Sequence, residues 1–106
     1  MPLRAVAQRA LALTTLEEVF SAATVDSGFI TLRSLVICNR SGTAATFRLS
    51  LAVGGEADAT KQYLFYDTPI VPNDSFTSAL EIGMRPGDLI RAYASTANLS
   101  ITLFGE

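Results

Sequence analysis

Hydrophobic and polar residues alternate with a period of two along much of this chain, as they do in a strand with one buried face. Residues 46–53 and 76–84 show the pattern most clearly. The positions predicted to face a core are Phe47, Leu49, Leu51, Val53, Phe76, Leu80, Ile82 and Met84. The positions predicted to face solvent are Thr46, Arg48, Ser50, Ala52, Thr77, Glu81 and Gly83. Both segments are therefore predicted to be strands of a sandwich.

Residues 28–39 form a longer and more apolar segment. Its predicted faces are Ile30, Leu32, Val36 and Cys38 on one side and Phe29, Leu35 and Ile37 on the other. Because both faces are apolar, we expect this strand to be central in its sheet or covered by a partner. The single cysteine, Cys38, lies inside the apolar run, so we expect a small buried hydrophobe rather than a reactive thiol.

Further short strands are predicted at residues 61–67, 89–95 and 99–104. In the last of these, Leu99, Ile101 and Leu103 are predicted to face the core. Turn-forming residues separate the strands at 39–42, 54–55, 72–74, 85–88 and 97–98. In the fourth of these turns, Pro86 and Gly87 suit the two central positions of a type II turn. The pattern predicts an all-β fold, an antiparallel, jelly-roll-like β-sandwich of about eight short strands.

The first twenty residues allow two interpretations. Leu3, Val6, Ala7, Ala10 and Leu11 recur at helical spacing, and Thr15 suits a helix cap. The alternative is a pair of extended segments, residues 4–9 and 16–21, that pair with the sheet or reach outward as an arm. We favour the extended form because β-branched and aromatic residues become frequent from Thr14 onward. Residues 1–13 are thus expected to be an N-terminal arm or first edge strand, and residues 14–106 the β-sandwich domain.

Composition narrows the classes of function. The chain has 106 residues and a net charge of -2, with eight Lys plus Arg against ten Asp plus Glu. A single domain of this length can bury a core without disulfides, and its charge is far from that of a nucleic-acid-binding protein. The chain has no His, the commonest general base and a common zinc ligand. We therefore expect no enzymatic activity, no catalytic residues, no cofactor, no bound metal and no nucleic-acid partner.

Membrane association is not expected either. No stretch approaches the roughly 20 apolar residues that a membrane-spanning helix needs. Near the start of the chain, Gln8 and Arg9 interrupt the apolar residues, so the segment does not match a signal peptide.

The densest aromatic segment is Tyr63-Leu64-Phe65-Tyr66-Asp67, in which at least one ring must point away from the buried face. It is the best candidate interface, although two core rings and one ordinary surface ring would explain it equally well. Aromatic rings beside carboxylates are also suited to carbohydrate binding, in which a sugar stacks on the ring and the carboxylates form hydrogen bonds with it. The acidic and amide residues of the nearby turns, Asp67, Asn73, Asp74 and Asp88, are candidate Ca²⁺ ligands, but turn formation explains them better.

Seven of the eight basic residues are arginines, which suit interfaces because the planar guanidinium pairs bidentately with carboxylates. Arg4 and Arg9 lie on the expected arm, and Arg33 and Arg91 lie on predicted strands. For Arg48, a solvated strand face that discourages edge pairing is the preferred interpretation.

The chain as a whole resembles small virion structural proteins of tailed bacteriophages. The matching segments are Thr14-Thr15-Leu16, Val36-Ile37-Cys38-Asn39-Arg40, Tyr63-Leu64-Phe65-Tyr66-Asp67, Asn73-Asp74, Gly87-Asp88, Leu99-Ser100-Ile101 and Phe104-Gly105. The resemblance spans nearly the full chain, and its motifs are strand and turn residues rather than catalytic groups. It departs from the usual pattern at residues 21–25, where Ser-Ala-Ala-Thr stands in place of a Val-Pro.

The resemblance implies a β-sandwich that acts as a head decoration (cement) protein and stabilises the capsid through oligomeric contacts, with a tail or fibre component or a carbohydrate-binding module as alternatives. It further implies a virion location after synthesis in the host cytoplasm, a homotrimer, and contacts with the major capsid protein or other virion proteins. The residues that would make these contacts are Leu3, Arg4, Val6 and Arg9 on the arm and Tyr63, Phe65 and Tyr66 on the aromatic strand.

Overall fold

A computed structural model describes residues 3–25 and 27–106, and this part of the chain forms eight strands and three short 3₁₀ helices. The strands are β1 (Arg4–Ala10), β2 (Glu17–Ser21), β3 (Ile30–Asn39), β4 (Ala45–Ala52), β5 (Tyr63–Ile70), β6 (Ser75–Met84), β7 (Leu89–Ala94) and β8 (Leu99–Gly105). The 3₁₀ helices are η1 (Ala22–Thr24), η2 (Val53–Gly55) and η3 (Thr60–Gln62). None of the described segments is a helix long and apolar enough to cross a bilayer.

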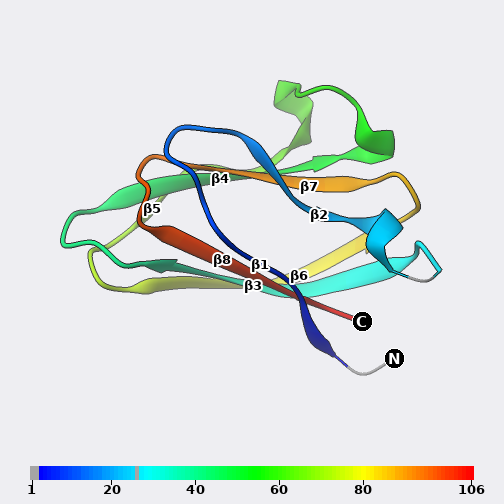
Figure 1. Cartoon of the computed structure of the whole chain (residues 1–106), viewed down its shortest axis with the longest axis horizontal. Helices are drawn as coiled ribbons and strands as arrows, with labels where there is room; N and C mark the ends of the chain where they lie inside the picture. Colours follow the sequence, from blue (N-terminus) through cyan, green and yellow to red (C-terminus); the bar gives the residue numbers. More distant parts are fainter. Residues whose placement is uncertain (1–2, 26) are drawn as a thin grey trace.

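The strands form two four-stranded antiparallel sheets, which lie one above the other in Figure 1. The strand orders are β1-β8-β3-β6 and β2-β7-β4-β5. Successive strands alternate between the two sheets except at β4 and β5, which are neighbours in one sheet. This order is that of two interlocked Greek keys, so the topology is that of a jelly roll. The predicted all-β, jelly-roll-like sandwich is confirmed.

The core fills the space between the sheets and is almost entirely apolar. Three phenylalanines bridge the two layers: the ring of the fully buried Phe47 lies 5.6 Å from that of Phe65 and 5.2 Å from that of Phe76. Phe76 belongs to the opposite sheet, so this cluster joins the layers directly. Tilted ring pairs at these distances are the preferred aromatic geometry.

The N-terminal segments are strands of the sandwich. β1 pairs with β8 and β2 pairs with β7, so the extended interpretation is confirmed and the helical one is wrong. A register shift between Ala5 and Ala7 in β1 lets both Val6 and Ala7 pack against the core. Residues 4–10 are thus an edge strand rather than a free arm (Figure 1).

β3 is central in its sheet, as its apolar character indicated, but the predicted division of its faces is wrong. A register shift around Arg33 interrupts the pairing with both β6 and β8. After this bulge the alternation is inverted, because one extra residue moves every later side chain to the other face. Ile30, Leu32, Leu35 and Ile37 are all buried in the core. Cys38 lies on the outer face and is only half-buried, so its expected burial is wrong.

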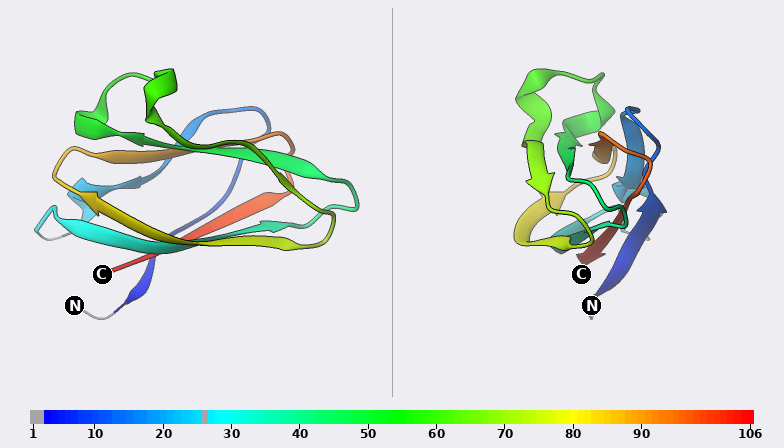
Figure 2. Two further views of the ribbon diagram at one scale, coloured as in Figure 1. Left: turned by 180° about the vertical axis from the view of Figure 1, so that it is seen from behind. Right: turned by 90° about the vertical axis from the view of Figure 1, so that its left-hand side faces the viewer.

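The end of β4 also departs from simple alternation. Val53 is exposed, whereas Ser50 and Ala52, predicted to face solvent, are fully buried. The excursion of residues 53–62, which stands out from the sandwich in Figure 2, contacts β4 through η3 and β7 through η2. The Arg91 guanidinium donates to the Glu56 carbonyl at 3.0 Å and holds the excursion on this sheet. The excursion therefore covers Ser50 and Ala52, which lie beneath it on the outer face of the sheet.

The faces of β6 and β8 match the prediction. In β6, Phe76, Leu80 and Ile82 turn toward the core and alternate with exposed residues. In β8, Leu99, Ile101 and Leu103 are buried. The turn at residues 85–88 has its Asp88 N–H bonded to the Arg85 carbonyl at 3.1 Å and Gly87 at φ 94°, which agrees with the predicted type II turn.

Candidate interaction surface

An arginine side chain lies between two tyrosine rings on the outer face of the sheet β2-β7-β4-β5. The guanidinium carbon of Arg48 is 4.2 Å from the ring centre of Tyr66 and 4.4 Å from that of Tyr93. Both distances are within the range of a cation–π interaction. The same guanidinium donates from Nε to Asp67 Oδ1 at 2.7 Å and from Nη2 to Asp67 Oδ2 at 3.4 Å. We call Arg48, Tyr63, Tyr66, Asp67 and Tyr93 the tyrosine–arginine cluster.

A bulge in β5 brings both Tyr66 and Asp67 to Arg48. Phe47 pairs with Thr68 and Leu49 pairs with Phe65, so two residues of β5 stand opposite Arg48 alone. Asp67 adopts φ 50° there, a left-handed conformation that Asp tolerates better than most residues. Without the bulge, Tyr66 and Asp67 would point to opposite faces of the sheet.

Tyr63 extends the cluster along β5. Its ring meets that of Tyr66 edge to face, with the ring centres 5.1 Å apart. Its hydroxyl lies 3.5 Å from the Asp58 carboxylate in the excursion after β4. The pKa of the Tyr63 phenol is raised, mainly by partial burial and to a smaller extent by the negative charge of Asp58. The Tyr63 hydroxyl donates to this carboxylate and so joins the cluster to the excursion after β4.

The contacts of Arg48 favour its charged form and fix the position of its side chain. Its hydrogen bonds to Asp67 raise the pKa of the guanidinium above its ordinary value, while partial desolvation acts in the opposite direction. Because the side chain is fixed between two rings and a carboxylate, a partner that binds here does not have to order it. Tyrosine and arginine are the residues most enriched, after tryptophan, in the energetically dominant parts of protein interfaces.

The structure separates the three aromatic residues that the sequence grouped together. Tyr66 is 57% exposed and Tyr63 is half-buried on the outer face, whereas Phe65 packs into the core against Phe47 and Phe76. Sequence reasoning missed Tyr93 and assigned Arg48 to a solvated strand face. Both side chains lie at outward positions of their strands. They are neighbours because β4 pairs with β7 in a register that places Tyr93 opposite Arg48.

The candidate residues in and just before β1 lie away from this cluster, on the side of the other sheet. Leu3 and Arg4 are exposed, and Val6 packs against the core. Arg9 Nη1 bonds to Glu17 Oε1 on β2 at 3.1 Å, so it ties the edges of the two sheets together. The seven predicted contact residues therefore fall into two separate regions.

Of the four candidate calcium ligands, the three aspartates each have a contact of their own. Asp67 binds Arg48, Asp88 accepts backbone N–H bonds from Gly54 and Arg85, and Asp74 accepts one from Ser75. Within residues 3–25 and 27–106, no three His, Cys, Asp or Glu side chains lie close enough to hold a metal ion.

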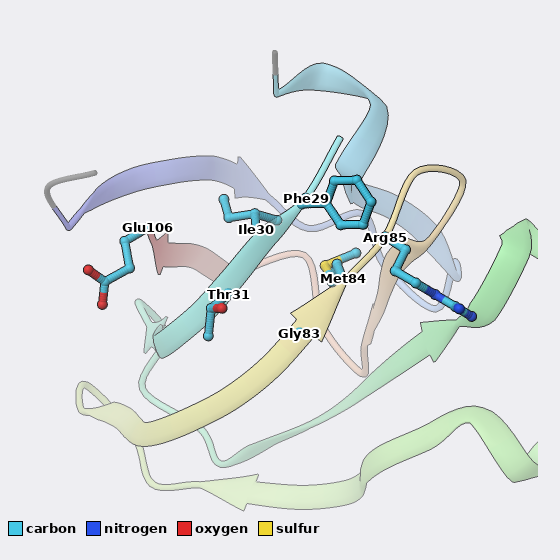
Figure 3. Close-up of a pocket in the computed structure, with 7 residues that line it drawn as sticks. All are labelled: Phe29, Ile30, Thr31, Gly83, Met84, Arg85 and Glu106. Atoms are coloured by element: carbon cyan, nitrogen blue, oxygen red, sulfur yellow. The ribbon is translucent and has the colours of Figure 1, made fainter. Parts of the chain in front are cut away.

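An open hollow of about 440 Å³ lies at the end of β3 and β6 (Figure 3). Its wall includes the exposed ring of Phe29 and the side chain of Met84. Its two charged residues, Arg85 and Glu106, point away from each other, and Glu106 is already bound to Arg33 Nε at 2.6 Å. The charged groups do not converge on one ligand, so the hollow is a weaker candidate than the tyrosine–arginine cluster.

No protein-family model matches the chain, and searches of the curated proteins and of the solved structures find no match either.

Proposed function

We propose that this protein is a structural component of a tailed-bacteriophage virion, acting as a head decoration (cement) protein that binds the assembled shell. The observation that carries the proposal is the tyrosine–arginine cluster, a preorganised group with the composition of a protein-binding hot spot. The jelly roll adds support by analogy only, since viral capsid domains, lectins and cupins share it. The resemblance of the sequence to small virion proteins points the same way.

The mechanism is one of linkage. A protein that binds only the assembled shell stabilises that state by mass action, in proportion to its affinity and free concentration. In this proposal Tyr66 and Arg48 contact the major capsid protein or another virion protein. The chain acts as an oligomer, which the resemblance suggests is a trimer, so several weak contacts on one shell add up.

The test uses particles produced without this chain. Purified protein is added back, and its co-sedimentation with the particles and the temperature at which the shells open are measured. We expect the wild-type chain to bind and to raise the opening temperature. Tyr66→Ala is expected to weaken binding on the order of tenfold or more. Val71→Ala, which removes another exposed apolar side chain outside the cluster, is the matched control and should bind normally.

Failure of the wild-type chain to bind shells would contradict the cement role. Recovery of the chain with purified tails instead would identify a tail or fibre component, and cryo-electron microscopy of intact virions would locate it directly. Equal binding by Tyr66→Ala and the wild type would remove the cluster from the interface.

Carbohydrate binding is the second candidate, favoured by the 57% exposure of the Tyr66 ring next to the Asp67 carboxylate. An exposed aromatic ring can stack on a sugar while carboxylates accept bonds from its hydroxyls. A glycan array probed with the wild-type chain and with Tyr66→Ala tests it. Specific glycan binding that Tyr66→Ala abolishes would support this function, and an array without signal would exclude it.

A further inference from the structure

The connection between β1 and β2, residues 11–16, differs in composition from the other connections between strands. Its sequence is Leu-Ala-Leu-Thr-Thr-Leu, without Gly, Pro, Asn or Asp. Each of the other six connections in the described fold contains a Gly, Pro or Asn, residues that favour turns. Threonine favours extended structure instead. The local sequence therefore opposes the reversal of direction that this connection makes (Figure 1).

The backbone of this connection is strained at Thr14. Thr14 adopts φ 44°, a left-handed conformation in which the Cβ crowds a backbone carbonyl and which is an outlier for a β-branched residue. Among the described residues, the other non-glycines with positive φ are Asp67 and Asn73, whose residue types tolerate it. Residues 12–15 are all exposed, so nothing packed over them holds the strained turn in place.

β1 can leave its sheet without dismantling the sandwich. It is the first strand of the chain and an edge strand, so β8 is its only pairing partner. Of the residues in β1, only Val6 and Ala7 pack against the core, and the buried Leu11 follows them. Separation of residues 3–11 therefore leaves the other seven strands paired.

The segment that fits the vacated edge of β8 is β1 of a second copy, because the same residues can form the same contacts there. Within one chain, Gln8 Nε2 donates to Thr102 Oγ1 at 3.2 Å and Arg9 Nη1 bonds to Glu17 Oε1 at 3.1 Å. Both contacts and the insertion of Leu11 re-form between two copies. No new surface has to supply the affinity, which is why exchange of an identical element is a low-cost route to an oligomer.

The gain from exchange lies in the connection itself. When residues 12–15 straighten, each copy gives up the bond from the Thr14 N–H to the Ala94 carbonyl at 2.8 Å. Each copy also loses the left-handed conformation at Thr14 and places an extended-favouring sequence in an extended form. Short connections under strain favour this kind of exchange.

We propose that copies of this protein exchange β1, so that residues 3–11 of one chain pair with β8 of another and residues 12–15 form the hinge. Four extended residues span up to about 14 Å, so the exchanging chains meet at the end of the sandwich that carries the hinge. Reciprocal exchange gives a dimer, and cyclic exchange among three copies gives a trimer through the same contacts. The inference goes beyond the cement role and does not require it.

A disulfide between β1 and β8 tests the exchange directly. Gln8 and Thr102 stand opposite each other, so Gln8→Cys and Thr102→Cys are combined with Cys38→Ser, which removes the only natural cysteine. The variant is refolded at increasing protein concentration, oxidised and run on a denaturing gel without reductant. Exchanged chains are linked to each other, whereas a chain that keeps its own β1 forms an intrachain bond and migrates as a monomer. We expect the linked fraction to rise with the refolding concentration.

Val36→Cys with Thr102→Cys, again with Cys38→Ser, is the matched control. Val36 and Thr102 also stand opposite each other, but they join β3 to β8 in the part of the sheet that does not exchange. This variant should form intrachain bonds at every concentration. Circular dichroism establishes that each variant is folded.

Substitutions at Thr14 test the hinge. Thr14→Gly removes the strain because glycine adopts the left-handed conformation freely, and we expect it to raise the dissociation constant of the oligomer at least tenfold in sedimentation. Thr14→Ala keeps a Cβ and should shift this constant at least threefold less. Thr14→Pro should lower the constant, because proline holds φ near -65° and excludes the closed turn.

Intrachain bonds alone at every refolding concentration would overturn the exchange of β1. A linked fraction that Thr14→Gly leaves unchanged in the Gln8→Cys and Thr102→Cys background would overturn the role of the hinge. Neither result bears on binding to shells, which is measured separately, so the two proposals can fail independently.

Discussion

The carboxylate of Asp88 accepts a hydrogen bond from the backbone N–H of Gly54 at 2.8 Å, although the two residues lie 34 positions apart in the chain. Its second oxygen accepts the backbone N–H of Arg85 at 3.0 Å, so one buried side chain joins the β6–β7 turn to the excursion that follows β4. These two backbone donors lower the pKa of the Asp88 carboxyl, with the Arg85 donor contributing most.

The stability of the fold should therefore depend on Asp88 at acid pH. A carboxyl whose pKa is lower in the folded state stabilises the fold above its unfolded pKa of about 3.9 and loses that contribution as pH falls through the folded value. We expect Asp88→Asn to reduce the free energy of unfolding by about 2 kcal/mol at pH 7, because an amide cannot accept from both donors.

Urea unfolding at pH 7, 5, 4 and 3 measures this effect. The difference between the wild type and Asp88→Asn should narrow below about pH 4 as the wild-type carboxyl becomes protonated. Asp74→Asn is the control, because the exposed Asp74 accepts only its neighbour's N–H and an amide oxygen can do the same. A gap that stays constant with pH would show that the charge of Asp88 is unimportant.

Asn39 should be one of the most costly polar residues to replace. Its fully buried Nδ2 donates to the carbonyl of Thr43 at 2.9 Å and to that of Ile70 at 3.2 Å, while Oδ1 accepts from the Ser41 N–H at 3.1 Å. Asn39→Ala leaves these backbone groups without partners, so we expect a loss of about 2–3 kcal/mol in urea unfolding.

Asn98→Ala is the comparison for this prediction. The exposed Asn98 side chain bonds only to Thr96 within its own turn, so its removal should cost less than about 1 kcal/mol. Equal effects of the two substitutions would refute the role assigned to Asn39.

The phenylalanine cluster predicts a large difference between two identical substitutions. Phe47→Ala removes a fully buried ring that contacts both Phe65 and Phe76, and should destabilise the protein by about 3–5 kcal/mol. Phe29→Ala removes a ring that is 62% exposed and should change stability by less than about 0.5 kcal/mol. Thermal and urea unfolding of the two variants provide the measurement, and similar losses would contradict the position of the core.

Two glycines in strands should respond oppositely to alanine. A Cβ at Gly105 would lie 2.9 Å from the Thr31 carbonyl oxygen, so Gly105→Ala must displace backbone and is expected to cost about 1–3 kcal/mol. A Cβ at Gly83 meets open space, and Gly83→Ala should be neutral or slightly stabilising because it restricts the unfolded chain. Melting temperatures of the two variants decide the point, and a stable Gly105→Ala would disprove the close approach.

Much of the fold could be predicted from local pattern. β6 and β8 are regular strands with one buried face, so their alternation identified the core residues correctly. The turn at Pro86 and Gly87 was predictable because proline sets one backbone angle and glycine permits the other. The faces of β3 were not predictable, because the extra residue at Arg33 is defined only by the pairing with β8, in which Leu32 and Ser34 stand opposite two adjacent residues.

The candidate surface was predictable only in part. The density of aromatic residues in β5 pointed to the correct strand, and alternation required that some ring face outward. Alternation alone did not place Asp67 on the same face as Tyr66. Their shared face depends on the bulge in which these two residues of β5 stand opposite one residue of β4. Arg48 and Tyr93 are 45 positions apart, and no local signal indicates that their strands are neighbours.

The sequence by itself determined the class of fold and the identity of most core residues, since a period of two is a local property of each strand. The tertiary structure decided the order of the strands and the bulges at Arg33 and Asp67. The physical reason is that sheet pairing joins distant segments, so the register and the facing of a side chain after a bulge depend on the neighbouring strand as well as on its own sequence.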